Sequence, residues 1–137
     1  MAFLLDTNVL SELRRGDRCN RGVRDWAGST RGERHYISVL SIGEIRKGIE
    51  LLRRHAPQQC PAFENWLERL QSEYAAETLA ITDLVSLRWG RLMAERTLPV
   101  IDGLLAATAL THHLTVVTRN VDDFADTGVP LINPFTS

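Results

Sequence analysis

Four acidic residues lie where a predicted strand ends or a predicted helix begins. Asp6 directly follows a short apolar run that is typical of a central strand covered on both faces. Glu44 comes after a second predicted strand, Asp102 begins an alanine-rich segment, and Asp123 follows the clearest late strand. Because the carboxyl ends of parallel strands meet at one edge of a sheet, we expect these side chains to face a common crevice.

Carboxylates gathered in one crevice repel one another, which raises their pKa values unless a cation compensates. Ligands that offer only oxygen suit Mg²⁺ or Mn²⁺, which prefer carboxylate and water. No histidine or cysteine group has the spacing of a zinc site. The residues therefore predict a divalent-ion site with open positions.

Each acid also has a structural alternative. Ser41 and Glu44 match the capping box S-x-x-E, in which the glutamate would serve only its own helix start. Asp102 could be an N-cap, and Asp122 and Asp123 could be favourable charges in a first helical turn. Asp6 is hardest to explain in this way, since it follows a buried apolar strand. The site hypothesis depends on all the acids meeting.

The elements that would position these acids alternate along the chain. Such alternation predicts one α/β domain over residues 1–137, a three-layer α/β/α sandwich with a central, mainly parallel sheet. Thr7 or Asn8 is available to cap the first helix. The predicted strands cover residues 3–5, 35–39, 78–81, 114–118 and 128–133, and the predicted helices 7–13, around 23–27, 41–56, 61–76, from 82–83 through 93, and 103–110.

The composition is that of an ordinary globular protein, with 137 residues, 44% hydrophobic and 24% charged. No apolar run approaches the roughly 20 residues that span a bilayer, and the start of the chain lacks the pattern of a signal peptide. We therefore expect a cytoplasmic protein. Cys19 and Cys60 should then be reduced rather than bridged.

Charge is unevenly distributed although the net charge is only −1. Residues 1–54 hold 11 of the 16 Lys and Arg but only 7 of the 17 Asp and Glu. Arginine suits phosphate because its planar fork can bind two oxygens at once. The arginines, among them Arg14, Arg15 and Arg18, thus predict either an RNA or partner surface or simply a solvated helical face.

Four motifs, in order and in register, resemble the PIN-domain ribonucleases. They are Leu-Asp-Thr-Asn at residues 5–8, Ser-Ile-Gly-Glu at 41–44, Asp-Gly-Leu-Leu-Ala-Ala-Thr-Ala at 102–109, and Thr-Arg-Asn at 118–120 followed by Asp-Phe at 123–124. The likeness covers essentially the whole chain. It is greatest to the VapC toxins of bacterial toxin–antitoxin pairs, including the FitB-like branch.

The resemblance implies roles for individual residues. Asp6, Glu44 and Asp102 match the family's acidic metal-binding and catalytic positions. Members differ at the fourth position, which leaves Asn120, Asp122 and Asp123 as candidates, of which we favour Asp123. Thr7 and Asn8 match polar residues that orient the first acid, and Asn120 is a further polar support.

The resemblance further implies an endoribonuclease that depends on Mg²⁺ or Mn²⁺, and one or two ions held by these acids make that reaction chemically sensible. It also implies a VapB-type antitoxin, a homodimer and a higher assembly with the antitoxin. DNA would be contacted only indirectly, through the antitoxin, and no membrane is involved.

Two other functions remain open from the residues. One is a dimeric binding module with weak catalysis that assists an antitoxin in operon repression. The other is a phosphotransferase with Asp6 as nucleophile. Asn8 disfavours the second, because haloacid-dehalogenase-type sites carry another aspartate at that spacing.

Overall fold

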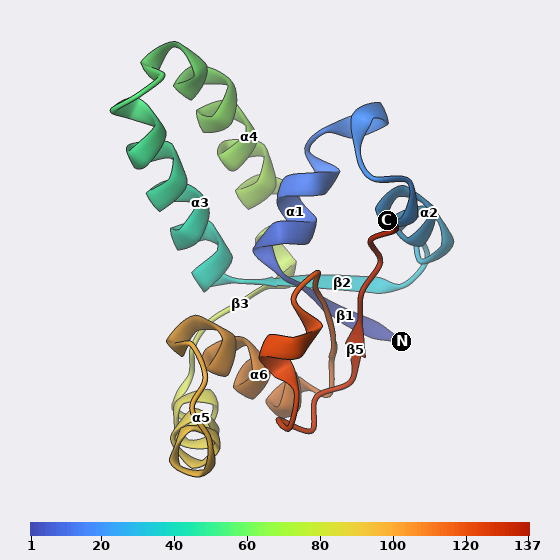
Figure 1. Cartoon of the computed structure of the whole chain (residues 1–137), viewed down its shortest axis with the longest axis vertical. Coiled ribbons are helices and arrows are strands. Elements are labelled where there is room, and N and C mark those ends of the chain that lie inside the picture. Colours follow the sequence, from blue (N-terminus) through green and yellow to red (C-terminus); the bar gives the residue numbers. More distant parts are fainter.

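The computed structural model describes all residues 1–137, in which helices cover both faces of one sheet (Figure 1). This is the three-layer α/β/α arrangement that the sequence predicted. In chain order the elements are β1 (Ala2–Leu5), α1 (Thr7–Leu13), α2 (Arg21–Ser29), β2 (Arg34–Ser38), α3 (Val39–Arg53), α4 (Cys60–Glu73), β3 (Thr78–Leu79), α5 (Asp83–Glu95), α6 (Val100–His112), β4 (Thr115–Val117) and β5 (Leu131–Ile132), with short 3₁₀ turns at 16–18, 57–59, 75–77 and 121–124.

The sheet is parallel throughout, in the order β3-β2-β1-β4-β5. The chain therefore leaves β1 toward β2 on one side and later returns to place β4 on the other side. The carboxyl ends of β1 and β4 form the topological switch point of the sheet, which is where open α/β folds bind ligands. Leu5 is in register with Val117, so the residues that follow these two strands are neighbours.

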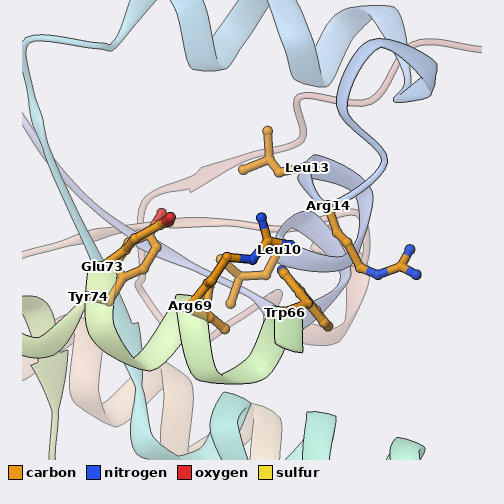
Figure 2. Close-up of a pocket in the computed structure, with 8 residues that line it drawn as sticks. Leu10, Leu13, Arg14, Trp66, Arg69, Glu73 and Tyr74 are labelled. Atoms are coloured by element: carbon orange, nitrogen blue, oxygen red, sulfur yellow. The ribbon is translucent and has the colours of Figure 1, made fainter. Parts of the chain in front are cut away.

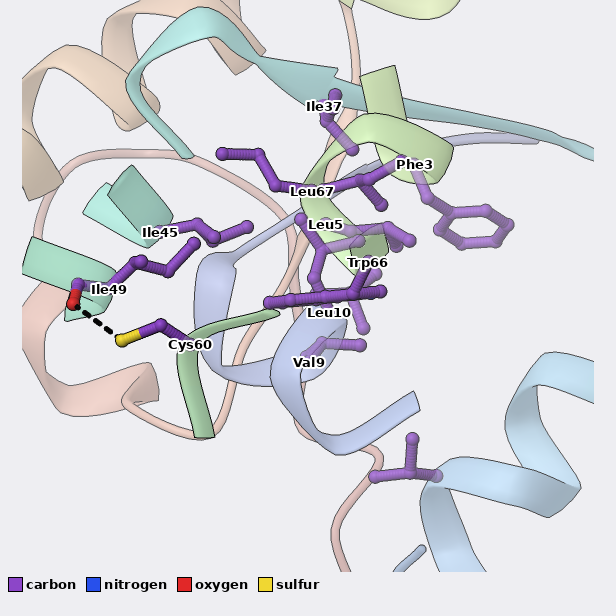
Figure 3. Close-up of a cluster of buried hydrophobic side chains, with 13 residues drawn as sticks. Phe3, Leu5, Val9, Leu10, Ile37, Ile45, Ile49, Cys60, Trp66 and Leu67 are labelled. Carbon is purple, nitrogen blue, oxygen red and sulfur yellow. Dashed lines mark hydrogen bonds between the residues drawn. The ribbon is translucent and has the colours of Figure 1, made fainter. Parts of the chain in front are cut away.

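Alternate residues of the central strands enter two separate cores. Phe3 and Leu5 join the core beneath α1 to α4, together with Ile37 and Val117 (Figure 3). Leu4 enters the other core. Both faces of β1 are thus buried, which explains why its sequence shows no polar alternation. The apolar face of α4 also packs into this core, with Trp66, Leu67 and Leu70 buried.

The second core lies under α5 and α6, where small side chains allow close packing. Ala106, Ala107 and Ala109 of α6 are completely buried. A Cβ atom added at Gly103 would lie 2.8 Å from Met93 Sδ and 3.2 Å from the indole of Trp89. The glycine therefore sets the distance between the two helices.

We expect Gly103→Ala to lower the free energy of unfolding by about 1 kcal/mol, because overpacking costs about 1–3 kcal/mol and alanine's helix propensity returns part of it. The matched control is Gly90→Ala in α5, where an added Cβ meets no atom within 4 Å. This control should gain about 0.5–1 kcal/mol. Urea denaturation of both variants checks the prediction, and equal signs for the two changes would contradict it.

Two helices begin earlier than predicted. α3 starts at Val39, capped by the Ser38 side chain, which accepts from the Leu40 N–H at 3.0 Å. α6 starts at Val100 after Pro99, a residue whose fixed φ favours a helix start. The strands predicted over 78–81 and 128–133 are only two residues each. The edges of the sheet are therefore shorter than hydrophobicity alone indicated.

Two expectations from composition can be compared with the structure. Cys19 and Cys60 are both buried and free, as predicted. No helix combines the length and apolar character needed to cross a membrane.

Candidate active site

Asp6 lies at the switch point, where β1 ends and α1 begins. It is only 7% exposed, and its Oδ1 accepts the backbone N–H of Thr7 at 2.8 Å. Asp6 is therefore the N-cap of α1, and the expectation that Thr7 or Asn8 would cap this helix is wrong. A cap at this position fixes the carboxylate where the strand meets the helix.

The other oxygen of Asp6 is held from β4. The buried Thr118 hydroxyl donates to Asp6 Oδ2 at 2.8 Å, and Asn8 Nδ2 donates to the same oxygen at 3.3 Å. Asn8 Nδ2 also contacts Thr118 Oγ1 at 3.3 Å, while Asn8 Oδ1 accepts from the Arg119 N–H at 3.1 Å. Asn8 thus ties α1 to the segment after β4 and contacts the carboxylate that the family resemblance implied it would orient.

Burial raises the pKa of Asp6 from its ordinary value. The hydrogen bonds from Thr118, Thr7 and Asn8 oppose this rise, and the charge of Asp123 adds to it. The carboxylate is therefore costly to ionise in the metal-free protein, and a nearby cation would relieve that cost.

Glu44 approaches from α3 on the other side of β1. Because α3 begins at Val39, Glu44 lies in its second turn, so the capping-box interpretation of Ser41 and Glu44 is wrong. The Thr7 hydroxyl donates to Glu44 Oε1 at 2.6 Å and shares a hydrogen bond of 2.9 Å with the Ser41 hydroxyl. Glu44 is thus hydrogen-bonded to the residue next to Asp6 and does not cap its own helix.

Asp102 lies in the first turn of α6 and is not its N-cap, which is Pro99. Burial raises the pKa of Asp102 to about 6, and the charges of Asp6, Asp123 and Glu44 contribute in that order. Three carboxylates from distant parts of the chain therefore lie close enough to Asp102 for their charges to act on it.

The turn after β4 contains the three candidates for a fourth position. Asn120, Asp122 and Asp123 are all exposed, and the last two belong to the 3₁₀ turn over 121–124. Asp123 raises the pKa of both Asp6 and Asp102, whereas Asp122 and Asn120 have no such effect. The Asn120 N–H donates to Thr118 Oγ1 at 3.0 Å, which gives this residue a supporting position.

The chemistry of the donors fits a divalent cation, since all four are carboxylates and their mutual repulsion favours a positive ion. No three acidic, histidine or cysteine side chains are arranged as a preformed metal site. The structure thus supplies the charge for an ion without a closed cage of ligands.

A groove of about 300 Å³ runs beside the carboxylates. It lies between α1 and the hairpin of α3 and α4, which extends away from the sheet (Figure 1). Thr7 and Glu44 line its polar end. Its other lining residues are mostly apolar, namely Ser11, Ile45, Gly48, Ile49, Leu52, Phe63 and Trp66.

Sequence reasoning did not assign two residues that contact the site directly. Thr118 holds Asp6, and Ser41 holds Thr7. The role of Thr118 depends on the register of β1 with β4, which places the residue after Val117 beside the residue after Leu5. Ser41 belonged to a recognised motif but was interpreted as a cap.

The candidate RNA-binding arginines lie apart from the carboxylates. Arg14 and Arg15 follow the end of α1, and Arg18 ends the next 3₁₀ turn. All three are exposed. They stand at the far end of the helix that begins beside Asp6.

A parallel sheet whose switch point gathers four acids defines a PIN-like α/β domain. The chain belongs to the PIN domain family, whose model matches residues 3–130. This confirms the resemblance drawn from the four sequence motifs.

Two relatives and one solved structure are similar over nearly the whole chain. The VapC ribonuclease Y4jK of Sinorhizobium fredii is 31% identical, with 97% of each chain covered. Toxin FitB of Neisseria gonorrhoeae is 30% identical, over 97% of this chain and 98% of that protein. The crystal structure of FitAcB from Neisseria gonorrhoeae superimposes with a TM-score of 0.85 at 30% identity, covering 96% and 97% of the two chains.

Proposed function

We propose that this protein is the toxin of a VapBC-type toxin–antitoxin pair, an endoribonuclease that requires Mg²⁺ or Mn²⁺. The observation that carries the proposal is the effect of the charges of Asp6, Asp123 and Glu44 on the pKa of Asp102, beside the buried carboxylate of Asp6 at the switch point of the sheet. The similarity to a VapC ribonuclease and to toxin FitB supports RNA as the substrate.

Asp6 and Asp102 would hold the ion, with Glu44 and Asp123 completing its surroundings or orienting the attacking water. When bound, the ion polarises the scissile phosphate and lowers the pKa of water. Thr118 and Asn8 hold Asp6 in position through hydrogen bonds, and these bonds favour its ionised form against the effect of burial. Attack of water on phosphorus leaves a 5′-phosphate and a 3′-hydroxyl.

The expected protein partner is a small VapB-type antitoxin. The groove between α1 and the α3–α4 hairpin supports this proposal, because it offers an apolar lining next to Glu44. An antitoxin segment seated there would cover the acidic edge. Contact with DNA would then arise through the antitoxin alone.

A homodimer is also expected, with a larger assembly when the antitoxin is bound. Large apolar side chains are exposed near the starts of α3 and α6 and further along α3, namely Val39, Val100 and Leu51. A second copy of the chain would remove them from water.

The second candidate function is a binding module with little catalysis, which pairs with an antitoxin in repression. The groove favours this function as much as it favours the enzyme. The intact set of four acids favours the enzyme, since binding alone does not require carboxylates that repel one another.

The test is cleavage of a panel of transfer, ribosomal and messenger RNAs by antitoxin-free protein, with Mg²⁺, Mn²⁺ or chelator. We expect discrete metal-dependent cuts that Asp6→Asn and Asp102→Asn abolish. Asp83→Asn, a change of an exposed acid at the start of α5, is the matched control and should cut like the wild type. Equal inactivity of all proteins on every RNA, with antitoxin binding retained, would favour the binding module.

A further inference from the structure

Four arginines surround a hollow of about 390 Å³ at the end of α1. Arg14, Arg15 and Arg18 approach it from the first third of the chain, and Arg69 approaches from α4 with Ala62 and Trp66. Figure 2 shows the neighbouring hollow, which shares Arg14, Trp66 and Arg69 with this one. Arg69 is close to the other arginines only in the folded chain.

Most of this positive charge is not neutralised by the protein itself. Arg15 pairs with Glu12 at 3.2 Å, but Arg14, Arg18 and Arg69 form no salt bridge. The exposed face of the α3–α4 hairpin is different. There Arg46 and Arg53 share Glu50 and Glu64 in one network of ion pairs, with N–O distances of 2.7 to 3.3 Å. The hollow therefore retains positive charge without an acidic partner, whereas every charge of the hairpin network is paired.

Arg14 is held in place by aromatic rings. Its guanidinium carbon lies 3.9 Å from the centroid of the Phe63 ring and 5.8 Å from that of Trp66. Stacking of this kind fixes the plane of the guanidinium and leaves its N–H groups free to donate. A fixed fork loses little conformational entropy when it binds a phosphate.

The hollow lies next to the groove that reaches the acidic edge. Trp66 lines both the hollow and the groove whose other end is formed by Thr7 and Glu44. Arg14 comes seven residues after Thr7, which is about 10 Å along a helix at 1.5 Å per residue. A strand that lies at the carboxylates therefore reaches the hollow well within the roughly 4–16 nucleotides that single-strand binding folds cover.

From these observations we infer that the hollow between α1 and α4 binds a backbone phosphate of the RNA substrate. The inference rests on the proposed function and extends it, since the carboxylates repel RNA and need a separate source of affinity. Arg14, Arg18 and Arg69 supply the contacts, and the groove carries the strand from this anchor to the acids. Phosphate contacts position the strand without reading its sequence.

The test measures binding of single-stranded RNA to the Asp102→Asn protein in chelator, so that no cleavage occurs. In this background Arg18→Gln/Arg69→Gln should weaken binding about tenfold at moderate salt and lower the slope of log K against log salt by about 1–2. The control is Arg88→Gln/Arg91→Gln on α5, which removes the same charge from two exposed, unpaired arginines over the opposite face of the sheet. Its affinity should stay within about twofold of the parent protein.

Equal weakening by both pairs of substitutions would overturn the inference, because it would reveal a general effect of charge. Unchanged binding in the Arg18 and Arg69 variant would also overturn it. A loss confined to antitoxin affinity would assign the hollow to the partner instead. In each of these cases metal-dependent cleavage by wild type would still stand, whereas absence of cleavage on every RNA would remove the proposed function and this inference together.

Discussion

Replacing Asp102 by asparagine should abolish cleavage and at the same time stabilise the metal-free protein. We expect RNA cleavage to fall at least about 100-fold, because even outer-shell partners of a metal cost about 10–100-fold when removed. The free energy of unfolding at pH 7 should rise by about 1–2 kcal/mol, since partial exposure of the side chain screens part of the effect. Function and stability therefore oppose each other at this residue.

The direction of the pH dependence follows from the raised pKa of about 6 for Asp102, against an ordinary value of 3.8. Between these values the folded chain binds more protons than the unfolded chain, so the stability of wild type falls as pH rises from about 4 to 6. The asparagine variant lacks this contribution. Its advantage should therefore be absent at pH 4 and complete above pH 6, as measured by urea denaturation in chelator.

Asp83→Asn is the matched control, because Asp83 also lies in the first turn of a helix but is exposed. Loss of its favourable interaction with the helix dipole should cost about 0.3–1 kcal/mol, the opposite sign. A destabilised Asp102→Asn protein, or an advantage independent of pH, would contradict the electrostatic account of the site.

Thr118→Val should damage both the fold and the site, although the two side chains have nearly the same shape. The buried hydroxyl donates to Asp6 and accepts from the N–H groups of Asn8 and Asn120. Valine leaves these groups without their partner, which should cost about 2–3 kcal/mol in the free energy of unfolding. Cleavage at saturating metal should fall about 10–100-fold, because Asp6 loses the bond that holds its ionised form in place.

Thr108→Val provides the comparison for this second prediction. Thr108 is equally buried, but its hydroxyl donates at 2.8 Å to the Leu104 carbonyl within α6. Loss of this hydroxyl leaves no acidic group without a hydrogen-bond donor. We therefore expect the free energy of unfolding to change by about 1 kcal/mol or less, with normal cleavage. A purely structural role for Thr118 would lower stability and leave the metal concentration for half-maximal cleavage unchanged, whereas we expect that concentration to rise.

Much of the fold could be predicted because local patterns agreed with the tertiary structure. The uninterrupted apolar run before Asp6 marked a strand buried on both faces, and β1 is indeed central. The predicted helix over 61–76 likewise corresponds to α4, at Cys60–Glu73. The first residue of α3 was harder to predict, since Ser38 and Ser41 are equally good N-caps by residue type. In the structure Ser38 caps the helix, whereas Ser41 contacts Thr7.

The acids of the site could be found from the sequence because each lies next to a strand end or a helix start. Among the supporting residues, Thr7, Asn8 and Asn120 were found only through the family resemblance, and others were not found at all. Thr118 reaches Asp6 only through the pairing of β1 with β4, and Arg69 joins Arg14 only through the packing of α4 on α1. Contacts between distant segments depend on register and packing, which a single sequence does not specify.

The pairing of Asp6 with Thr118 also has a consequence for a chain that is still being made. The two residues are 112 positions apart, and β1 stays without one neighbour until β4 has been synthesised. At about 5–20 residues per second, the ribosome needs on the order of ten seconds to add the missing segment. The N-terminal half therefore carries Asp6 and Glu44 without a complete site, and a prematurely terminated product lacks Asp102, Thr118 and Asp123.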